Sequence, residues 1–289
     1  MSAIAERLSL RGRLPRLRVT SGITAIIVKE LRGRMRGRRA FIIVTIHVLL
    51  LAALAWMLLR INEEALSNNF SNGGQSTVYS ASVGRGIFIG LMLLQTLMVA
   101  VLAPAATAGA ISSEREHQTL DLLTVTPISS LAIVLGKLLS ALAWIFVLIL
   151  ASIPVTALVF VFGGVAPDDV VRAYLVLFAT VIGLGSVGIF FSALTRRTGA
   201  STGLTFVTTL ALTLGTLFVF VFLAGTAEVS STGLRKQPSE AILYLNPFVA
   251  QIDVACGTED GAFSGACGIM SGIVGATDPG NSPPDALPT

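Results

Sequence analysis

The chain has 289 residues, of which 53% are hydrophobic and only 12% are charged, and its net charge is +4. Soluble domains have a charged fraction of about 25%, and the mean hydropathy here is +0.81. These values exclude an ordinary soluble domain. They predict an all-α, polytopic integral membrane protein, with an N-terminal amphipathic helix in the membrane interface and about five transmembrane helices.

Residues 1–39 carry eleven Lys or Arg residues and two acids, which predicts a cytoplasmic segment. A nucleic-acid-binding arm is the alternative, but it lacks the aromatic residues that stack on bases. Contact with anionic lipid headgroups explains the charge more simply, so we expect membrane lipid and no nucleic acid as partner. Apolar residues recur here at helical spacing, as in an interfacial helix rather than a fraying basic tail. The residues that define this helix are Ile23, Ile26, Ile27, Lys29, Leu31 and Arg32.

Five apolar runs are close to the roughly 20 residues that cross a bilayer, and together they define a membrane domain over residues 40–226. The predicted spans are 40–59, 86–111, 138–162, 170–194 and 202–224. With the N-terminus inside, fifteen of the 20 Lys and Arg residues lie on the cytoplasmic side. This asymmetry predicts a multi-pass protein of the cell (plasma) membrane with a cytoplasmic N-terminus.

Ionisable groups are scarce within the predicted spans. His47 is the only one well inside a span, and Lys137, at a cytoplasmic edge, is expected to snorkel towards the headgroups. Proton relays and intramembrane enzymes need several buried acids, histidines or metal ligands, so the sequence argues against both. We expect His47 to be hydrogen-bonded in the packing rather than to contact substrate. Pro104 and Pro154 favour kinks, which serve either gating or packing.

Gly183, Gly185 and Gly188 spell the dinucleotide-binding pattern G-x-G-x-x-G, but inside a predicted membrane span. That fingerprint works only at a strand-to-helix turn that approaches a pyrophosphate. The glycines, with Ser186 and Ser192, instead predict a small-residue face for close helix packing.

The sequence has no P-loop. The motif requires G-x-x-x-x-G-K-[ST], whereas Gly136-Lys137 is followed by Leu138 and preceded by Leu131 at the first glycine position. If transport is active, ATP must therefore be hydrolysed by another polypeptide.

The polar stretch 113–137 between the second and third spans predicts a cytoplasmic docking element. Ser113 and Glu116 have the spacing of a capping box, which starts a helix. Pro127 should end it, and a turn and second helix should follow. The apolar face of the first helix holds Leu120 and Leu123. The alternative is an ordinary solvated loop.

The run E-R-E-x-x-T-L-D-x-L-x-x-x-P, followed nine residues after Pro127 by Gly136-Lys137, resembles the cytoplasmic segment of ABC-2 type transporter permeases. The resemblance extends from the basic N-terminal helix to about Ala224. In that family the loop after the second span carries a helix that contacts the ATP-binding subunit. By position, the coupling residues here would be Glu114, Arg115, Glu116, Thr119, Leu120, Asp121, Leu123 and Pro127.

The resemblance implies a permease subunit of an exporter rather than an enzyme. A second permease subunit, identical or related, would complete the translocation path, and a separate ATP-binding cassette subunit would hold ATP and Mg²⁺, with no cofactor in this chain. Two alternatives stay open. One is a membrane scaffold or sensor that needs no ATPase, and the other, disfavoured by the missing catalytic groups, is an intramembrane enzyme.

Residues 227–289 are predicted to be external and to end in a Pro-rich, disordered tail. Short surface helices are expected over 239–254, around Asn246-Pro247-Phe248, a stretch like the N-P-F that often precedes a sixth span in the resembled family. The apolar run 262–276 is too short and too rich in glycine to be that span. The pattern favours a six-span permease truncated before its last helix over a natural five-span form.

Both cysteines, Cys256 and Cys267, fall in this external segment. Their short separation and the oxidising compartment favour a disulfide that closes a small loop. A metal pair is the weaker alternative, because neither histidine is near in sequence.

Overall fold

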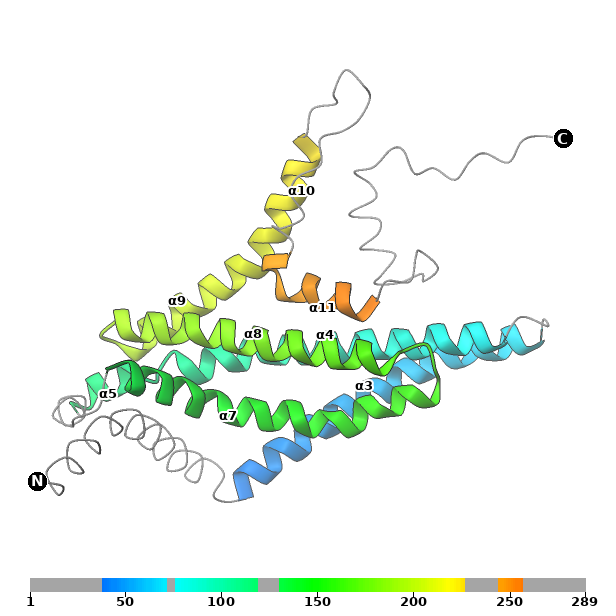
Figure 1. Cartoon of the computed structure of the whole chain (residues 1–289), viewed down its shortest axis with the longest axis horizontal. Helices are drawn as coiled ribbons and strands as arrows, with labels where there is room; N and C mark the ends of the chain where they lie inside the picture. The colour runs from blue at the N-terminus through cyan, green and yellow to red at the C-terminus, as the bar shows by residue number, and fades with distance from the viewer. Residues whose placement is uncertain (1–37, 72–75, 119–129, 227–243, 257–289) are drawn as a thin grey trace, which may run out of the picture. The chain divides into compact units, whose positions relative to one another are not determined.

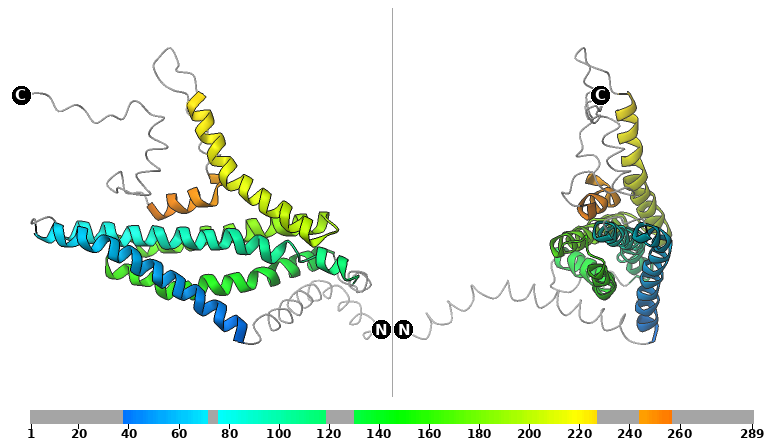
Figure 2. Two further views of the ribbon diagram at one scale, coloured as in Figure 1. Left: turned by 180° about the vertical axis from the view of Figure 1, so that it is seen from behind. Right: turned by 90° about the vertical axis from the view of Figure 1, so that its right-hand side faces the viewer.

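The computed structural model describes residues 38–71, 76–118, 130–226 and 244–256, and these residues form helices and no strands (Figure 1). The same helices can be followed from two further directions in Figure 2. The helices are α3 (Arg38–Ser71), α4 (Ser76–Thr107), α5 (Ser112–Glu116), α7 (Ser130–Ala157), α8 (Pro167–Leu194), α9 (Thr198–Leu210), α10 (Thr216–Thr226) and α11 (Pro247–Cys256). A 3₁₀ turn, η1 (Leu158–Val161), extends α7, and a π-helical segment, η2 (Ala211–Gly215), joins α9 to α10.

Five helical runs in the described residues are long and apolar enough to cross a membrane. They are Phe41–Ile61, Val83–Glu116, Ser130–Val161, Pro167–Leu194 and Thr198–Phe220. The predicted fold class, an all-α polytopic membrane protein, is therefore confirmed. The predicted interfacial helix lies outside the described residues.

Large apolar side chains remain exposed along all five spans. Examples are Phe41, Trp56, Val101, Leu150, Leu175, Val207 and Phe218. Patches of this kind are rare on the surface of a soluble monomer. They are what a helix needs where it faces lipid, because its backbone groups are paired within the helix and its side chains meet hydrocarbon.

The chain divides into two compact units. The first comprises Met1–Ile46, Ala100–Leu150 and Val181–Val207, and the second comprises His47–Val99, Ala151–Thr180 and Thr208–Thr289. Each is described by itself below.

The second unit has a buried polar core. Gln95 on α4 donates a hydrogen bond from Nε2 to Ser152 Oγ on α7 (2.5 Å). The hydroxyl of Tyr174 on α8 lies 2.9 Å from both Ser152 Oγ and Thr156 Oγ1. All four side chains are buried. These bonds join α4, α7 and α8, and none of the four residues was predicted from the sequence.

Arg85 also belongs to this unit. It lies within α4, its side chain is only 5% exposed, and its Nη2 atom is 3.6 Å from Asp169 Oδ2 on α8. A buried guanidinium needs such a partner, because an unpaired buried charge is strongly unfavourable. The first turn of α8 therefore packs on α4 through an ion pair.

His47 is also buried in this unit, as expected for a packing residue. The expected hydrogen bond is absent at Nε2, which has no partner among the described residues.

Short surface helices were expected over residues 239–254, and the described part of that range begins at Tyr244. One short helix, α11, forms there. It exposes Asp253 and buries Val249, Gln251 and Ala255, and Asn246 just before it is fully buried. The amides of Asn246 and Gln251 find partners on other helices.

Two consecutive glycines connect η1 to α8. Gly163 and Gly164 have φ angles of 78° and 80°, in the left-handed region that other residues avoid. A Cβ atom at Gly164 would overlap the backbone of Ala81 on α4, whereas a Cβ atom at Gly163 would meet nothing within 4 Å. The close approach of this turn to α4 therefore depends on Gly164.

Gly164→Ala should accordingly destabilise the protein more than Gly163→Ala. Both changes carry the cost of a left-handed residue, about 1–2 kcal/mol, but Gly164→Ala adds a backbone overlap of about 1–3 kcal/mol. Thermal unfolding of the purified protein in detergent measures the difference. Equal unfolding temperatures for the two variants would show that the turn does not pack on Ala81.

Candidate functional site

The candidate site lies in the first unit, where the second span ends. After Thr107 the chain leaves the α-helix for a turn over residues 108–111, forms the short helix α5, and turns again at residues 117–118. We call residues 108–118 the α5 junction. It contains the first three predicted coupling residues, Glu114, Arg115 and Glu116.

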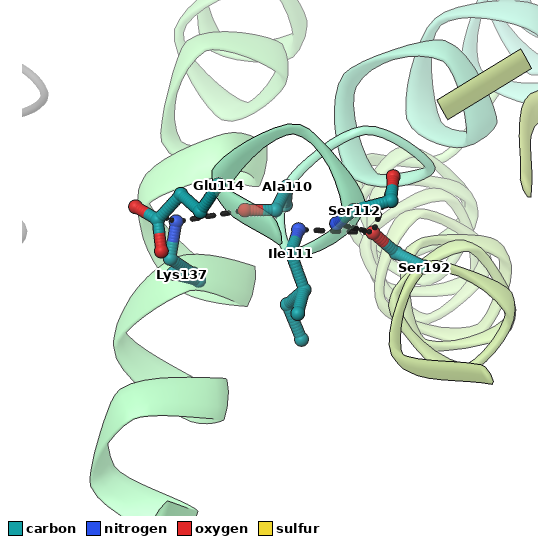
Figure 3. Close-up of polar contacts among 6 residues, drawn as sticks. All are labelled: Ala110, Ile111, Ser112, Glu114, Lys137 and Ser192. Carbon is teal, nitrogen blue, oxygen red and sulfur yellow. Dashed lines mark hydrogen bonds and ion pairs between the residues drawn. The ribbon is translucent and has the colours of Figure 1, made fainter. Parts of the chain in front are cut away.

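Two serines from other helices pair backbone groups of the turn at 108–111. Ser192 Oγ on α8 accepts hydrogen bonds from the backbone N–H groups of Ile111 (2.9 Å) and Ser112 (3.0 Å), as Figure 3 shows. Ser201 on α9 donates a hydrogen bond of 2.6 Å to the carbonyl of Ala108. Backbone groups that are buried without a partner are costly, so the two hydroxyls stabilise the break and fix its position.

Gly188 allows α8 to approach the end of α4 closely, because a Cβ atom there would overlap the side chain of Thr107. A Cβ atom at Gly185 would crowd a leucine side chain of α7. The predicted small-residue face is therefore confirmed at these positions. It is wrong for Gly183, where a Cβ atom would meet nothing within 4 Å, and for Ser186, which is exposed and bonds to its own helix.

Lys137 on α7 is part of the site, and the snorkelling predicted for it is wrong. Its Nζ atom lies 2.6 Å from Glu114 Oε1 and donates a hydrogen bond of 2.7 Å to the carbonyl of Ala110 (Figure 3). The side chain of Lys137 is 9% exposed and that of Glu114 is 25% exposed. The ammonium group turns inwards because the carboxylate and the carbonyl replace its water.

Glu116 binds α9 rather than its own helix. Its carboxylate accepts hydrogen bonds from the backbone N–H (2.8 Å) and the hydroxyl (3.0 Å) of Thr198, the first residue of α9. The predicted capping box of Ser113 and Glu116 is therefore wrong, since α5 begins at Ser112 without a side-chain cap. A carboxylate at a helix N-terminus is favourable, and here the carboxylate of Glu116 pairs the first backbone N–H group of α9.

The helix predicted to run from Ser113 towards Pro127 is shorter than expected. It ends at Glu116, and Gln118 in the following turn has a φ angle of 57°, which an α-helix cannot contain. Arg115 donates a hydrogen bond of 3.4 Å to the carbonyl of Thr195 at the end of α8. The remaining predicted coupling residues, Thr119, Leu120, Asp121, Leu123 and Pro127, lie outside the described residues.

These contacts connect α5 to the start of α7, the end of α8 and the start of α9, besides α4 that leads into it. They come from an ion pair and from hydrogen bonds to backbone groups, which fix direction as well as distance. A displacement of α5 would therefore be passed to several spans at once. The described residues contain no group of three or more His, Cys, Asp or Glu side chains that could hold a metal ion.

The other predicted site residues lie elsewhere. The interfacial set, Ile23, Ile26, Ile27, Lys29, Leu31 and Arg32, is outside the described residues. Cys256 ends α11 and is disulfide-bonded. Its expected partner, Cys267, lies outside the described residues, so the pairing stays a prediction.

A comparison with protein families matches residues 24–259 to the family described as ABC-2 family transporter protein. The chain belongs to this family. The match covers all five spans and the α5 junction, and it makes this chain a membrane component of a transporter. No curated protein matches this chain.

The inward-facing Lys137 of this ABC-2 protein can be tested for its contribution to stability. Lys137→Met should lower the free energy of unfolding by about 2–4 kcal/mol, because removing one partner of a buried ion pair costs roughly 3–5 kcal/mol and Glu114 is partly exposed. The matched control is Arg172→Met, since Arg172 and Asp168 form a 2.5 Å pair with side chains 60% and 66% exposed. Removing that pair should cost at most about 0.5 kcal/mol.

Thermal unfolding in detergent compares the two variants of this ABC-2 protein. A loss for Lys137→Met no larger than that for Arg172→Met would mean that Lys137 does not stabilise the junction.

Proposed function

We propose that this chain is the permease subunit of an ATP-binding cassette exporter. In this proposal it pairs with a second permease subunit to form the translocation path, and a separate ATPase subunit, which binds ATP and Mg²⁺, drives it. The observation that supports the proposal best is the α5 junction, where the first residues of the predicted coupling segment are bonded to three other spans of a protein of the ABC-2 family.

The position of the coupling segment favours mechanical coupling. Its remaining part, residues 119–129, follows the junction directly and ends where α7 begins at Ser130. On one side it is attached to α5, which Glu116 binds to α9. On the other side it is attached to α7, where Lys137 binds both Glu114 and the junction backbone. A protein that moved this segment would act on anchored helix ends rather than on a loose loop.

The charge distribution supports a cytoplasmic position for the junction in the cell membrane. Arg196 and Arg197 lie exposed between α8 and α9, and Arg115 bonds to the carbonyl of Thr195, the residue before Arg196. Basic residues concentrate on the cytoplasmic side of a membrane protein, where an ATPase has access to ATP. The N-terminus, with its eleven Lys and Arg residues in residues 1–39, lies on the same side in this proposal.

Docking and transmission of force are separable in two variants. Leu123→Asp should weaken binding of the ATPase at least about tenfold, because burying an unpaired carboxylate costs several kcal/mol and about 1.4 kcal/mol is tenfold in affinity. Ser192→Ala should keep the ATPase bound but reduce substrate-stimulated hydrolysis. It leaves the N–H groups of Ile111 and Ser112 without their hydroxyl partner and so loosens the junction.

The measurement is co-purification of an ATPase from membranes of the source cell, followed by its ATP hydrolysis in lipid vesicles. Ser186→Ala is the control for Ser192→Ala, since Ser186 lies on the same helix and its exposed hydroxyl bonds to Gly183 two turns from the junction. Normal insertion of each variant is checked first. Full binding and coupling in Leu123→Asp would contradict the docking role, and absence of any ATPase would favour the membrane scaffold.

A further inference from the structure

The π-helical segment η2 (Ala211–Gly215) interrupts the fifth span within the second unit. Figure 1 shows α9 and α10 as one run of helix with this segment between them. A π-helix has i→i+5 hydrogen bonds and is rare, and single π turns inside α-helices frequently mark functional sites. Such a turn contains one residue more than the α-helical turn that it replaces.

A side chain from outside the span pairs with this segment. Asn246, 33 residues after Thr213 and fully buried, donates from Nδ2 to the carbonyl of Thr213 (2.6 Å) and to Thr216 Oγ1 (3.2 Å). A π turn displaces carbonyls from their normal N–H partners, and in a membrane span each unpaired one is costly. The Asn246 amide gives the carbonyl of Thr213 a donor from outside the span.

The threonine hydroxyls of the segment make their shortest bonds to other carbonyls. Thr213 donates to the carbonyl of Thr209 (3.0 Å) or Leu210 (3.1 Å), and Thr216 donates to that of Leu212 (2.6 Å), while its distance to the carbonyl of Thr213 is 3.3 Å. Threonine makes this bond to its own helix in ordinary α-helices too, as Thr205 does with Ser201. Their bonds therefore do not distinguish π from α geometry, whereas the bond from Asn246 does.

Asn246 directly precedes α11, which holds it in place. Its Oδ1 atom accepts a hydrogen bond of 3.0 Å from the backbone N–H of Phe248, as an N-cap does. One turn on, Gln251 Nε2 donates to the carbonyl of Ala173 on α8 (3.2 Å). The asparagine is thus fixed by α11, and α11 is fixed on α8.

We infer that Asn246 is a latch that holds η2 in the π form. When its amide leaves Thr213, the segment relaxes to an α-helix and α10 turns about its own axis by about 100°, the angle of one residue. This turn would put each residue of α10 in the place of its successor, so Val219, which is 44% exposed, would move to the place of Phe220, which is 2% exposed. The inference does not require an ATPase partner, so its test is independent of the proposed function.

The test replaces only the donor. Asn246→Ser keeps an oxygen that caps α11, but its hydroxyl is too short to reach Thr213. A spin label at Val219→Cys in the full chain, reconstituted in lipid without reductant, reports exposure to oxygen dissolved in the membrane. The same chain without Val219→Cys gives the background from native cysteines. We expect Asn246→Ser to cause a loss of oxygen accessibility at position 219.

A second variant removes the extra residue itself. Deletion of Leu214, an exposed residue of η2, should give an α-helix with α10 in its original orientation, so the label should be as accessible as in the parent. When Leu214 is deleted, Asn246→Ser should not change the oxygen accessibility of the label. Unchanged accessibility in Asn246→Ser alone overturns the latch. If Asn246→Ser does not fold, recovery by the deletion supports the latch, and failure of the doubly altered chain to fold overturns it.

Discussion

Every backbone N–H and C=O group in the hydrocarbon core of a bilayer must be paired within the protein, because no water is there to replace a lost bond. A continuous α-helix meets this condition by itself, and an interrupted one does not. In the part of the chain that the structure describes, two spans are interrupted, at residues 108–111 and at η2. Each break is paired by polar side chains from other segments: Ser192 and Ser201 at the first, Asn246 at the second.

The side chains that pair the breaks also determine what the breaks can do. At the α5 junction they come from α8 and α9, and Lys137 and Glu116 add charged contacts with α7 and α9. The predicted coupling segment therefore begins at a point already bonded to the membrane helices. At η2 the partner is a single amide on a short helix, so the geometry of α10 depends on one contact.

The sequence predicted the spans well, because a run of about 20 apolar residues is a length signal that needs no tertiary partner. It also located the junction through its polar residues. It failed on their roles, since Glu116 and Thr198 are 82 residues apart and the local capping-box spacing favoured Ser113. Lys137 was expected at the headgroups for the same reason, because its partner Glu114 lies on another helix. A pattern of residue types gives no sign of Asn246 pairing with Thr213.

The central claim is that the α5 junction is a fixed part of the membrane domain. Amide hydrogen exchange at Ile111 and Ser112, measured on the full chain in lipid, tests it directly, because both N–H groups are bonded to the buried hydroxyl of Ser192. The account predicts that these amides exchange as slowly as those in the middle of α4. Exchange as fast as in an unstructured peptide would contradict it, since a loose loop could not pass force to the three spans bonded to the junction.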